Sequence, residues 1–408
     1  MTERNPDVVI IGAGPIGASA ALGLAQSGLE VVLADARPPT PQVRSDGRNF
    51  AIVAGSWRLL TRLGVTDELA AACEPLWGLE AIDGGRHWLG RPRLRFTARD
   101  LEGADPDEPL GQMVRAEALQ AALDSKVARQ ENLSVMAPAR FLTLQPEEGS
   151  VAVHFETGDR LSTGLVLGAD GINSAVRSAL NIRTEGRDYQ QSVFTANVKL
   201  SEPHHGIARQ LFTPEGPFAT LPLPDNCANL AWYLKRGAAE TLADLPREQA
   251  EAELNLRFAE FAGPMRILSE TGAYPLKLQL ATEIIGPHAA LLGDAARRVT
   301  PLAGQGLNQG FRDVAALIES AREAMYLGGA IGSAQMLAAY SQARRFEGSA
   351  TALFLDGIDR LFSNDLAVPK VARSIGLQLA ANFPPLRKTM TQHASASEPS
   401  VHALMDFL

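Results

Sequence analysis

The chain has 408 residues, 46% of them hydrophobic, which is enough for two interlocked domains or one large domain around an extensive core. Its formal net charge is −8 at pH 7. This acidic balance argues against a general nucleic-acid-binding protein, because phosphate backbones attract basic surfaces.

The first stretch of the chain carries a dinucleotide-binding pattern. An apolar strand is expected from Asp7 to Ile11, a helix from Ala18 to Gln26 and a second strand from Val31 to Ala34. Between the first strand and the helix lies GAGPIG, with Gly12, Gly14 and Gly17, and Asp35 ends the second strand. Glycines allow a tight turn and close approach to a pyrophosphate, and the acid can bond a ribose. The alternative is a glycine turn without a ligand, and the pattern does not choose between NAD and FAD.

Two arginines follow at the edges of expected elements. A polar, proline-rich loop leads to Arg48, and a helix is predicted from Ala51 to Leu63. Irregular sequence is expected from Asp83 to Pro109, and Arg115 stands at the start of the next helix. From the residues alone, ordinary surface charge is the better explanation of both arginines.

A second motif follows three predicted strands. These are Leu133 to Met136, Ala139 to Gln145 and Ser150 to Glu156, the last two joined as a hairpin through residues 147–149. One further apolar run, Leu161 to Leu167, ends at GADGINSAVR, which contains Asp170, Gly171, Ser174 and Arg177. An acid and a glycine at the carboxyl end of a strand are typical of a ligand crevice in an α/β sheet.

From Tyr189 to about Leu280 the pattern is rich in strands. One amphipathic helix, Arg247 to Phe261, interrupts them. Strands without intervening helices predict an antiparallel sheet, inserted as a second domain into the first. The expected strands are Ser192 to Leu200, Ile207 to Phe212, Phe218 to Leu221, Ala228 to Leu234 and Tyr274 to Leu280.

The stretch from His288 to Asp313 combines a strand, a turn, a glycine-rich loop and a helix start. Its strand covers Ala289 to Leu292, and Gly293 and Asp294 form the turn. The loop contains Pro301, Gly304 and Gly306, and the helix begins near Leu307 and Asn308. Backbone N–H groups and the positive end of a helix dipole can there face an electron-rich ligand. Further helices are expected at Ala334 to Arg345, Thr351 to Phe362, Leu366 to Leu379 and after Pro385, followed by a polar tail from Ala394.

The three motifs GAGPIG, GADGINSAVR and GDAARRVTPLAGQGLNQGFRD, in this order, resemble the single-component FAD-dependent aromatic hydroxylases that include p-hydroxybenzoate hydroxylase. TPLAGQGLNQGFRD, DGRNFAIVAGSWRLLTRLGV and FLDGIDRLFSND look more narrowly like the ubiquinone-biosynthesis hydroxylases of the UbiH/UbiF/VisC type. The resemblance runs from about residue 6 to 392.

The resemblance implies an α/β fold: a Rossmann-like FAD-binding domain, an inserted antiparallel substrate domain and a C-terminal helical region. We expect the FAD-binding domain at residues 1–188 and 282–330 and the substrate domain at 189–281. The helical region would cover 331–393, and 394–408 would form a mobile tail.

The resemblance also implies roles for particular residues. Gly12, Gly14 and Gly17 would hold the FAD pyrophosphate and Asp35 the adenosine ribose, although most relatives have Glu there. Arg48 and Arg115 would contact the cofactor. Asp170 and Gly171 would serve FAD and nicotinamide binding, and Asp294, after Gly293, would bond the ribityl chain. The isoalloxazine would be lined by Pro301, Gly304, Gly306, Leu307 and Asn308.

Two positions depart from the family pattern. Many relatives have His where this chain has Arg297, and His or Asn is frequent where it has Thr300. These departures concern flavin movement or the choice of electron donor rather than the reaction class, and Arg297 has no role in this interpretation.

The expected reaction is hydroxylation of an electron-rich phenol with O2 and NAD(P)H or another reductant, through a flavin C4a-hydroperoxide. Tyr233 and Tyr274 lie on predicted strands and are the candidate bases for the phenolic proton, but packing is the more common role of strand tyrosines. The seven histidines form no convincing ligand set, so no metal is expected.

Neither a signal peptide nor a membrane span is expected from the sequence. The first residues lack the basic-then-apolar layout of a signal peptide, and no run of about 18 apolar residues occurs. Cys73 and Cys227 fit no disulfide framework or thiolate metal site, so each is predicted to be a small buried side chain. The protein is expected to be cytoplasmic, at most peripheral on the inner face of a membrane.

A polyprenylated substrate would require contact with a membrane surface or a quinone-biosynthesis protein complex. Between Leu366 and His393 stand four basic residues and no acidic ones, which suits an interfacial face, although a helix packed on its own domain explains them too. The oligomeric state is open, and a homo-oligomer is compatible with the sequence. The competing functions are hydroxylation of a small soluble aromatic metabolite and non-catalytic prenyl binding, as in the Rab GDP-dissociation inhibitors.

Overall fold

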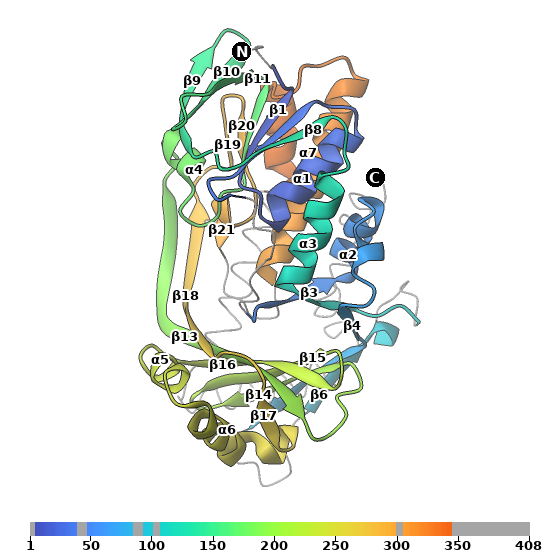
Figure 1. The fold of residues 1–408 in the computed structure, drawn as a ribbon, viewed down its shortest axis with the longest axis vertical. Coiled ribbons are helices and arrows are strands. Elements are labelled where there is room, and N and C mark those ends of the chain that lie inside the picture. Colours follow the sequence, from blue (N-terminus) through green and yellow to red (C-terminus); the bar gives the residue numbers. More distant parts are fainter. Residues whose placement is uncertain (1–4, 39–46, 85–92, 101–106, 299–304, 345–408) are drawn as a thin grey trace.

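The computed structural model describes residues 5–38, 47–84, 93–100, 107–298 and 305–344 (Figure 1). The predicted loop residues Thr300, Pro301 and Gly304 lie outside these ranges. So do the predicted helices after residue 345, the basic segment from Leu366 to His393 and the predicted tail.

The first layer is a six-stranded sheet in the order β19-β20-β12-β1-β2-β8. Its strands from β20 to β8 are parallel, and the short edge strand β19 is antiparallel. Every residue of β1, β2, β12 and β20 is buried, as expected for parallel strands covered on both faces. The bounds are β1 Val8–Ile11, β2 Val31–Ala34, β8 Leu133–Met136, β12 Leu165–Gly168, β19 Ile285–Gly286 and β20 Ala289–Leu291.

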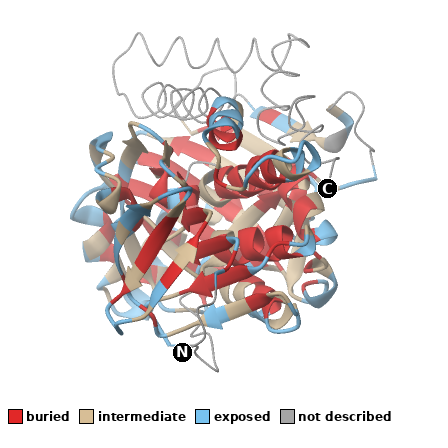
Figure 2. Cartoon of the chain, turned by 90° about the horizontal axis from the view of Figure 1, so that it is seen from above, coloured by how far each residue is buried: buried red, intermediate tan, exposed pale blue. Residues whose placement is uncertain are grey.

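Helix α1 (Pro15–Gln26) packs between α3 (Ala116–Val127) and α7 (Gln305–Tyr326) beside this sheet (Figure 1). The buried residues concentrate in these strands and in the inward faces of the helices (Figure 2). The sequence predicted each of these helices to within a few residues, and residues 334–344 form a further helix.

The hairpin predicted through residues 147–149 is confirmed. It joins β9 (Phe141–Glu147) to β10 (Ser150–Phe155), and β11 (Arg160–Thr163) completes a three-stranded sheet. The single strand predicted from Leu161 to Leu167 is wrong. The chain turns at Gly164, so that β11 pairs with β10 while β12 enters the parallel sheet beside β1.

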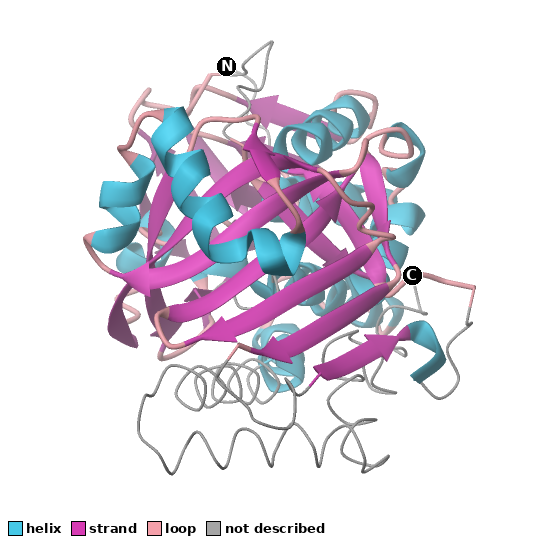
Figure 3. Cartoon of the chain, turned by 90° about the horizontal axis from the view of Figure 1, so that it is seen from below, coloured by secondary structure: helices cyan, strands magenta, loops and turns pink. Residues whose placement is uncertain are grey.

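A nine-stranded sheet forms the second large layer, in the order β21-β18-β13-β16-β15-β14-β5-β6, with β17 also paired to β13. Helices α5 (Ala238–Ala243) and α6 (Arg247–Ala262) cross its outer face (Figure 3). The bounds are β5 Gly78–Asp83, β6 Arg93–Thr97, β13 Thr184–Leu200, β14 Ile207–Thr213, β15 Gly216–Leu223, β16 Cys227–Lys235, β17 Met265–Ile267, β18 Gly272–Ala281 and β21 Arg297–Arg298.

This sheet and its helices correct four expectations. Strand β6 falls inside the region predicted to be irregular, and β5 and β6 join a sheet that we expected to begin at residue 189. The pairing of β14 with β5 is parallel, so the sheet is mixed rather than antiparallel. Helix α5 is an additional helix that the sequence did not predict. Contacts far apart in the chain decide these features, so local patterns could not show them.

A small sheet connects the two layers, in the order β3-β7-β4. The helix predicted from Ala51 begins three residues later, because β3 (Asn49–Val53) pairs with β7 (Gly111–Arg115) before α2 (Ala54–Arg62) starts. Strand β4 covers Cys73–Leu76. Cys73 and Cys227 are free and half-buried, not fully buried as predicted.

Candidate active site

The first two sequence motifs meet at the carboxyl end of the parallel sheet. Strand β1 lies between β2 and β12, so the connections that follow β1 and β12 diverge on either side of the carboxyl end of β1. This is the switch point where α/β sheets bind ligands. Gly12 has a φ of +106°, and a Cβ on it would lie 2.4 Å from the carbonyl oxygen of Ala169. A Cβ on Gly17 would lie 1.8 Å from the carbonyl oxygen of Gly12. Both glycines are therefore required by the fold itself.

Gly14 differs from these two glycines. It is the N-cap of α1, and a Cβ on it would meet no protein atom within 4 Å. No side chain caps this helix, and its first turn contains no acidic residue. The open space above Gly14 and the free N–H groups of the first turn fit a bound phosphate.

Asp35 lies beside the glycine loop. Its Oδ2 accepts a hydrogen bond from Ala13 N at 2.8 Å, and its Oδ1 accepts from Arg37 N at 2.8 Å and from Arg37 Nε at 3.1 Å. Burial opposes ionisation, but the hydrogen bonds from Arg37 and Ala13 outweigh it and lower the pKa of Asp35. An ionised carboxylate with two oxygens keeps capacity to accept a ribose hydroxyl.

Helix α3 contributes two residues near this point that the sequence did not single out. Gln120 Nε2 donates to Ala13 O at 2.9 Å and to Asp124 Oδ1 at 2.8 Å. Burial raises the pKa of Asp124, with the charge of Arg37 acting in the opposite direction. No local pattern marks either residue, because only the packing of α3 on α1 brings them to the loop.

Asp170 holds the turn of the second motif and leaves one oxygen available. Its Oδ2 accepts from Ala175 N at 2.7 Å and Val176 N at 3.2 Å. Its Oδ1 is buried and has no partner within the described part of the chain. Gly171 has a φ of +79° and open space where a Cβ would stand. A buried acceptor without a partner requires an explanation, and a cofactor hydroxyl would supply one.

Arg177 joins the second motif to the third. It is buried, and its guanidinium donates to Ala295 O at 2.9 Å and Ile172 O at 2.7 Å. Ser174, the N-cap of α4 (Ala175–Ala179), accepts from Arg177 N at 3.0 Å. The helical spacing of Ser174 and Arg177 in the sequence is therefore that of an N-cap residue and the residue whose backbone N–H it accepts.

Asp294 lies where the third motif faces Arg48. Its side chain is exposed, yet desolvation raises its pKa, while the charges of Arg298 and Arg48 lower it. The carboxylate of Asp294 is therefore open to solvent on one side and desolvated by surrounding protein on the other. Arg115 stands beside Arg48, because Ala116 N donates to Arg48 O at 3.0 Å and Arg115 pairs with Asn49.

The structure gives Arg297 a role that the sequence did not. Its guanidinium is 5% exposed and binds Asp313 Oδ1, which also accepts from Arg344 Nε at 2.8 Å. Asp313 Oδ2 accepts from Gly293 N at 2.9 Å. One buried carboxylate therefore fixes the turn before Asp294, strand β21, helix α7 and the helix at 334–344.

Asn308 ties the start of α7 to strand β3 through its side-chain amide. Its Oδ1 accepts from Val53 N at 3.1 Å and its Nδ2 donates to Ala51 O at 2.7 Å. Its side chain positions the strand that follows Arg48. Leu307 is half-buried against the core, and a Cβ on Gly306 would meet only open space. Contact of these residues with the isoalloxazine stays a prediction.

Tyr233 and Tyr274 lie in one row across three strands. Both are direct cross-strand neighbours of Val193, on the face of the nine-stranded sheet that is turned away from α5 and α6. Tyr233 is 4% exposed and Tyr274 is 40% exposed. The structure brings the two tyrosines together, and a proton-accepting role for either stays a prediction.

The residues present fit FAD. The open helix start at Gly14, the carboxylate of Asp35 and the unpaired oxygen of Asp170 are groups that phosphate and sugar hydroxyls require. Within the described ranges, no cluster of three or more His, Cys, Asp or Glu residues could hold a metal ion. None of the helices in those ranges is long and apolar enough to cross a membrane.

Comparison with known proteins agrees with this geometry. The family described as FAD binding domain matches residues 5–352. The ubiquinone hydroxylase UbiL of Rhodospirillum rubrum is 34% identical over 394 residues, covering 96% of this chain and 90% of that protein. The 3-demethoxyubiquinol 3-hydroxylase of Escherichia coli is 33% identical over 398 residues, covering 97% and 99%.

Solved structures show the same fold. The p-nitrophenol 4-monooxygenase PnpA of Pseudomonas putida superposes with a TM-score of 0.77 at 18% identity, covering 97% of this chain and 99% of that chain. PqsL of Pseudomonas aeruginosa gives a TM-score of 0.75 at 21% identity, covering 92% and 100%. The chain belongs to the family with this FAD binding domain and is an FAD-dependent aromatic monooxygenase related to the ubiquinone hydroxylases.

Proposed function

We propose that this chain hydroxylates the aromatic ring of a polyprenylated phenol in ubiquinone biosynthesis, with O2 as oxygen source and NAD(P)H as the reductant. The observation that carries the proposal is the meeting of three motifs at the carboxyl end of one parallel sheet. The names of the relatives at 33% and 34% identity support the substrate class.

The chain's own residues would bind and orient the cofactor. The N-terminus of α1, with Gly14 at its cap, would hold the pyrophosphate, and Asp35 would accept from the adenosine ribose. Asp294 would bond the ribityl chain, with Arg48 beside it. Bound FAD would supply the activation of O2 and the transfer of oxygen to the ring.

The start of α7 would then act on the ring end of the cofactor. The N–H groups near Gly306 and Leu307 carry the positive end of the helix dipole, which stabilises negative charge. Asn308 would keep α7 in register with β3, and Arg177 and Asp313 would hold the turn at Gly293. These residues bind and position; none of them needs to exchange a proton.

We further propose that residues 189–281 act as the substrate domain, with the FAD-binding domain at 1–188 and 282–330. Strands β5 and β6 complete the sheet of the substrate domain although they precede it in the chain. A partner surface, whether a membrane or a quinone-biosynthesis complex, would present the insoluble substrate. The basic residues between Leu366 and His393, within the predicted helical region at 331–393, make that segment the candidate for such a contact.

The names of the relatives favour this substrate over a small aromatic acid. The central row of the sheet face holds Tyr274, Val193 and Tyr233, followed by Thr195 and Ala231, and Lys235 stands on the same face two residues after Tyr233.

Expression in a bacterial strain that lacks one ring hydroxylase of ubiquinone synthesis would test the proposal. Mass spectrometry should show that the accumulated precursor, which lacks one ring hydroxyl, is converted and that ubiquinone returns. Strains lacking different ring hydroxylases would identify the position. The purified protein should be yellow and oxidise NAD(P)H slowly with unprenylated phenols. A colourless protein, or failure to restore ubiquinone in every strain, would contradict the proposal.

A further inference from the structure

At one end, the nine-stranded sheet narrows to a band of two strands, which we call the ribbon and which consists of residues 184–188 of β13 and 277–281 of β18. The ribbon forms the left margin of the molecule in Figure 1. On its inner side, β18 pairs with β21. On its outer side, residues 184–188 pair with no further strand in the described part of the chain, because β16 joins β13 only from Gln191 onward. This part of β13 is therefore an open edge.

The open edge presents backbone groups that point away from the sheet. Thr282 N donates to Arg183 O at 2.9 Å, so the backbone of Arg183 faces β18. Hydrogen-bonding direction alternates along a strand, so residues 185 and 187 face β18 as well. The N–H and C=O groups of Thr184, Gly186 and Asp188 consequently point outward, and residues 184–187 are exposed. Unpaired outward groups of this kind form a template for another strand.

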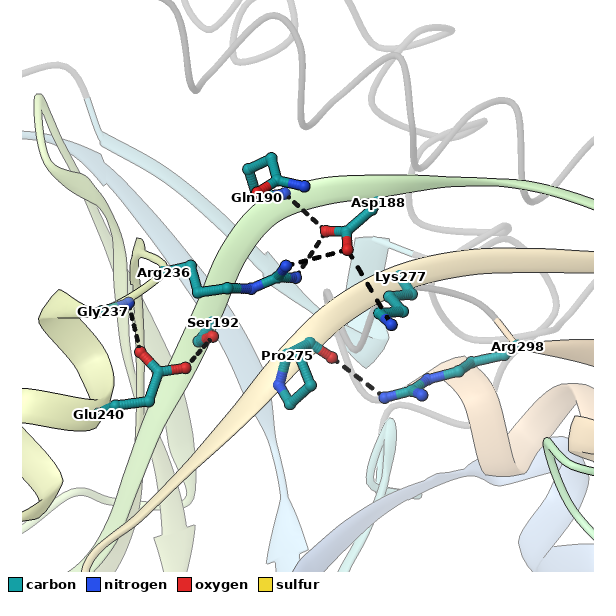
Figure 4. Close-up of polar contacts among 9 residues, drawn as sticks. All are labelled: Asp188, Gln190, Ser192, Arg236, Gly237, Glu240, Pro275, Lys277 and Arg298. Atoms are coloured by element: carbon teal, nitrogen blue, oxygen red, sulfur yellow. Dashed lines mark hydrogen bonds and ion pairs between the residues drawn. The ribbon is translucent and has the colours of Figure 1, made fainter.

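A bulge limits the open edge at its far end. Between Asp188 and Ser192 the register of β13 against β18 shifts, and Gln190 has a φ of +56°. The Asp188 carboxylate accepts from Gln190 N at 2.9 Å and from Arg236 at 2.6 Å and 3.0 Å (Figure 4). Lys277 lies 4.0 Å from the same carboxylate. These contacts hold the side chain of Asp188 on one face of the ribbon and leave its backbone groups at the edge. The bulge thus fixes the open edge at residues 184–188.

The charges along the open edge are arranged symmetrically about Gly186. Glu185 precedes it and Arg187 follows it, and both lie on the same face of the ribbon, because side chains two residues apart share a face. Arg187 lies 5.8 Å from the centre of the Tyr189 ring. Within the described residues, neither Glu185 nor Arg187 has an ion-pair partner. Opposite charges on either side of a glycine are self-complementary for a second copy that runs antiparallel.

One register uses the whole open edge and satisfies both the backbone and the charges. With Gly186 of two copies paired about a twofold axis, the two glycines would exchange hydrogen bonds, and Thr184 would exchange them with Asp188 of the second copy. Glu185 would then stand opposite Arg187 of the second copy, at non-hydrogen-bonded positions where side chains lie closest. A shift by two residues in either direction places glutamate opposite glutamate or arginine opposite arginine. A shift by one residue removes the hydrogen bonds, because outward-facing groups then meet inward-facing ones.

We propose that the open edge is a dimerisation surface, at which two copies of this chain pair their ribbons antiparallel about a twofold axis at Gly186. Such an interface is isologous, because both copies contribute the same residues. It joins the nine-stranded sheets of the two copies into one continuous sheet and pairs the outward backbone groups. The competing explanation is that the charges keep other strands away from an exposed edge, and it predicts a monomer. The proposal is independent of the substrate.

Sedimentation equilibrium of the FAD-loaded full chain tests this surface, at protein concentrations up to about 100 μM because so short a ladder is at the weak end of specific interfaces. The natural chain should show a reversible monomer–dimer equilibrium. Glu185→Arg should raise the Kd of the dimer by about tenfold or more, because two attractive cross-strand pairs become two repulsive ones. Arg187→Glu should have the same effect. Glu148→Arg, at the exposed turn between β9 and β10, changes the charge equally and should leave the Kd unchanged.

Two mixtures test the register itself. An equimolar mixture of Glu185→Arg and Arg187→Glu should regain the dimer, because each edge arginine of one variant then stands opposite an edge glutamate of the other. A mixture of Glu185→Cys and Arg187→Cys should form a disulfide-linked heterodimer, because opposite non-hydrogen-bonded residues have Cα atoms about 4.5 Å apart, within the range of a disulfide. Either cysteine variant alone should cross-link far more slowly, because its two cysteines would lie diagonally, about 7–8 Å apart.

Three results would overturn the proposal. A natural chain that stays monomeric over the whole concentration range supports the protective role of the charges instead. An assembly whose mass is unchanged by both charge reversals forms through another surface. A mixture of the two reversed variants that remains monomeric, although each variant retains FAD and its melting temperature, excludes the pairing of Glu185 with Arg187 of the second copy.

Discussion

Replacing Asp313 by Asn should destabilise the protein more than any other single change of charge among the residues that hold the flavin-facing turn. Asp313 is fully buried and serves Arg297, Arg344 and Gly293 N at once. Asparagine keeps the volume and one acceptor but removes the charge. Arg297 and Arg344, which are 5% and 0% exposed, would then lose their shared carboxylate.

The magnitude follows from the cost of separating a buried ion pair. Removing one partner of such a pair costs about 3–5 kcal/mol, a large share of the roughly 5–15 kcal/mol that stabilises a typical protein. At about 2.1 cal/mol/K per residue, a chain of 408 residues has an unfolding entropy of roughly 0.9 kcal/mol/K. A loss of about 4 kcal/mol therefore lowers the melting midpoint by about 5 °C.

Thermal and urea unfolding of the apoprotein would measure this loss, with two comparison variants. Arg297→Met leaves Asp313 bound to Arg344 and Gly293, so its cost should be smaller than that of Asp313→Asn. Asp188→Asn breaks the more exposed pair with Arg236, which solvent screens, and should cost much less than Asp313→Asn. The hub role of Asp313 is refuted if Asp313→Asn costs no more than Asp188→Asn, or if Arg297→Met costs more than Asp313→Asn.

Four further variants probe the residues expected to hold the cofactor. Gly17→Ala should prevent stable folding, because the added Cβ would overlap the carbonyl oxygen of Gly12. Gly14→Ala should fold, because its Cβ would meet open space, but should lose FAD affinity. Equal melting temperatures of the two apoproteins would contradict this difference. Asp294→Asn should yield protein with little FAD. The raised pKa of Asp294 contributes stability that is present below its unfolded pKa near 3.8 and lost as pH rises through the folded value. The Asp294→Asn apoprotein should therefore melt at a higher temperature than the natural apoprotein at pH 7, and this difference should disappear as the pH is lowered. A lower melting temperature of the variant at pH 7 would contradict the inferred desolvation of Asp294. The pKa of Asp35 is lowered, so its contribution to stability is present above its unfolded pKa of about 3.8 and is lost as pH falls through the folded pKa. Asp35→Asn should therefore reduce the melting temperature at pH 7. The two proteins should melt at the same temperature in acid, which melting curves at several pH values would measure.

Local sequence determined the strands and helices that frame the cofactor site. The apolar run at Val8–Ile11, the glycines after it and the helix to Gln26 form from neighbouring residues, so periodicity and turn chemistry were sufficient to predict them. Gly12 and Gly17 are required at their positions by backbone contacts within the motif or with its neighbouring strand. The same holds for Arg177, whose spacing from Ser174 follows the helix that Ser174 caps.

Only the tertiary structure decided the partners that are distant in the chain. Asn308 bonds to β3 across more than 250 residues, and Asn49 meets Asn197 across 148. Strand β5 pairs with β14, which lies 129 residues further along the chain, as in the pair Gly78 and Ile207. Leu161 and Leu167 belong to two different sheets. No local period records such pairings, because they depend on which surfaces pack together. Arg297 shows this most clearly: no role followed from its sequence position, and its buried carboxylate partner on α7 makes it a structural tie.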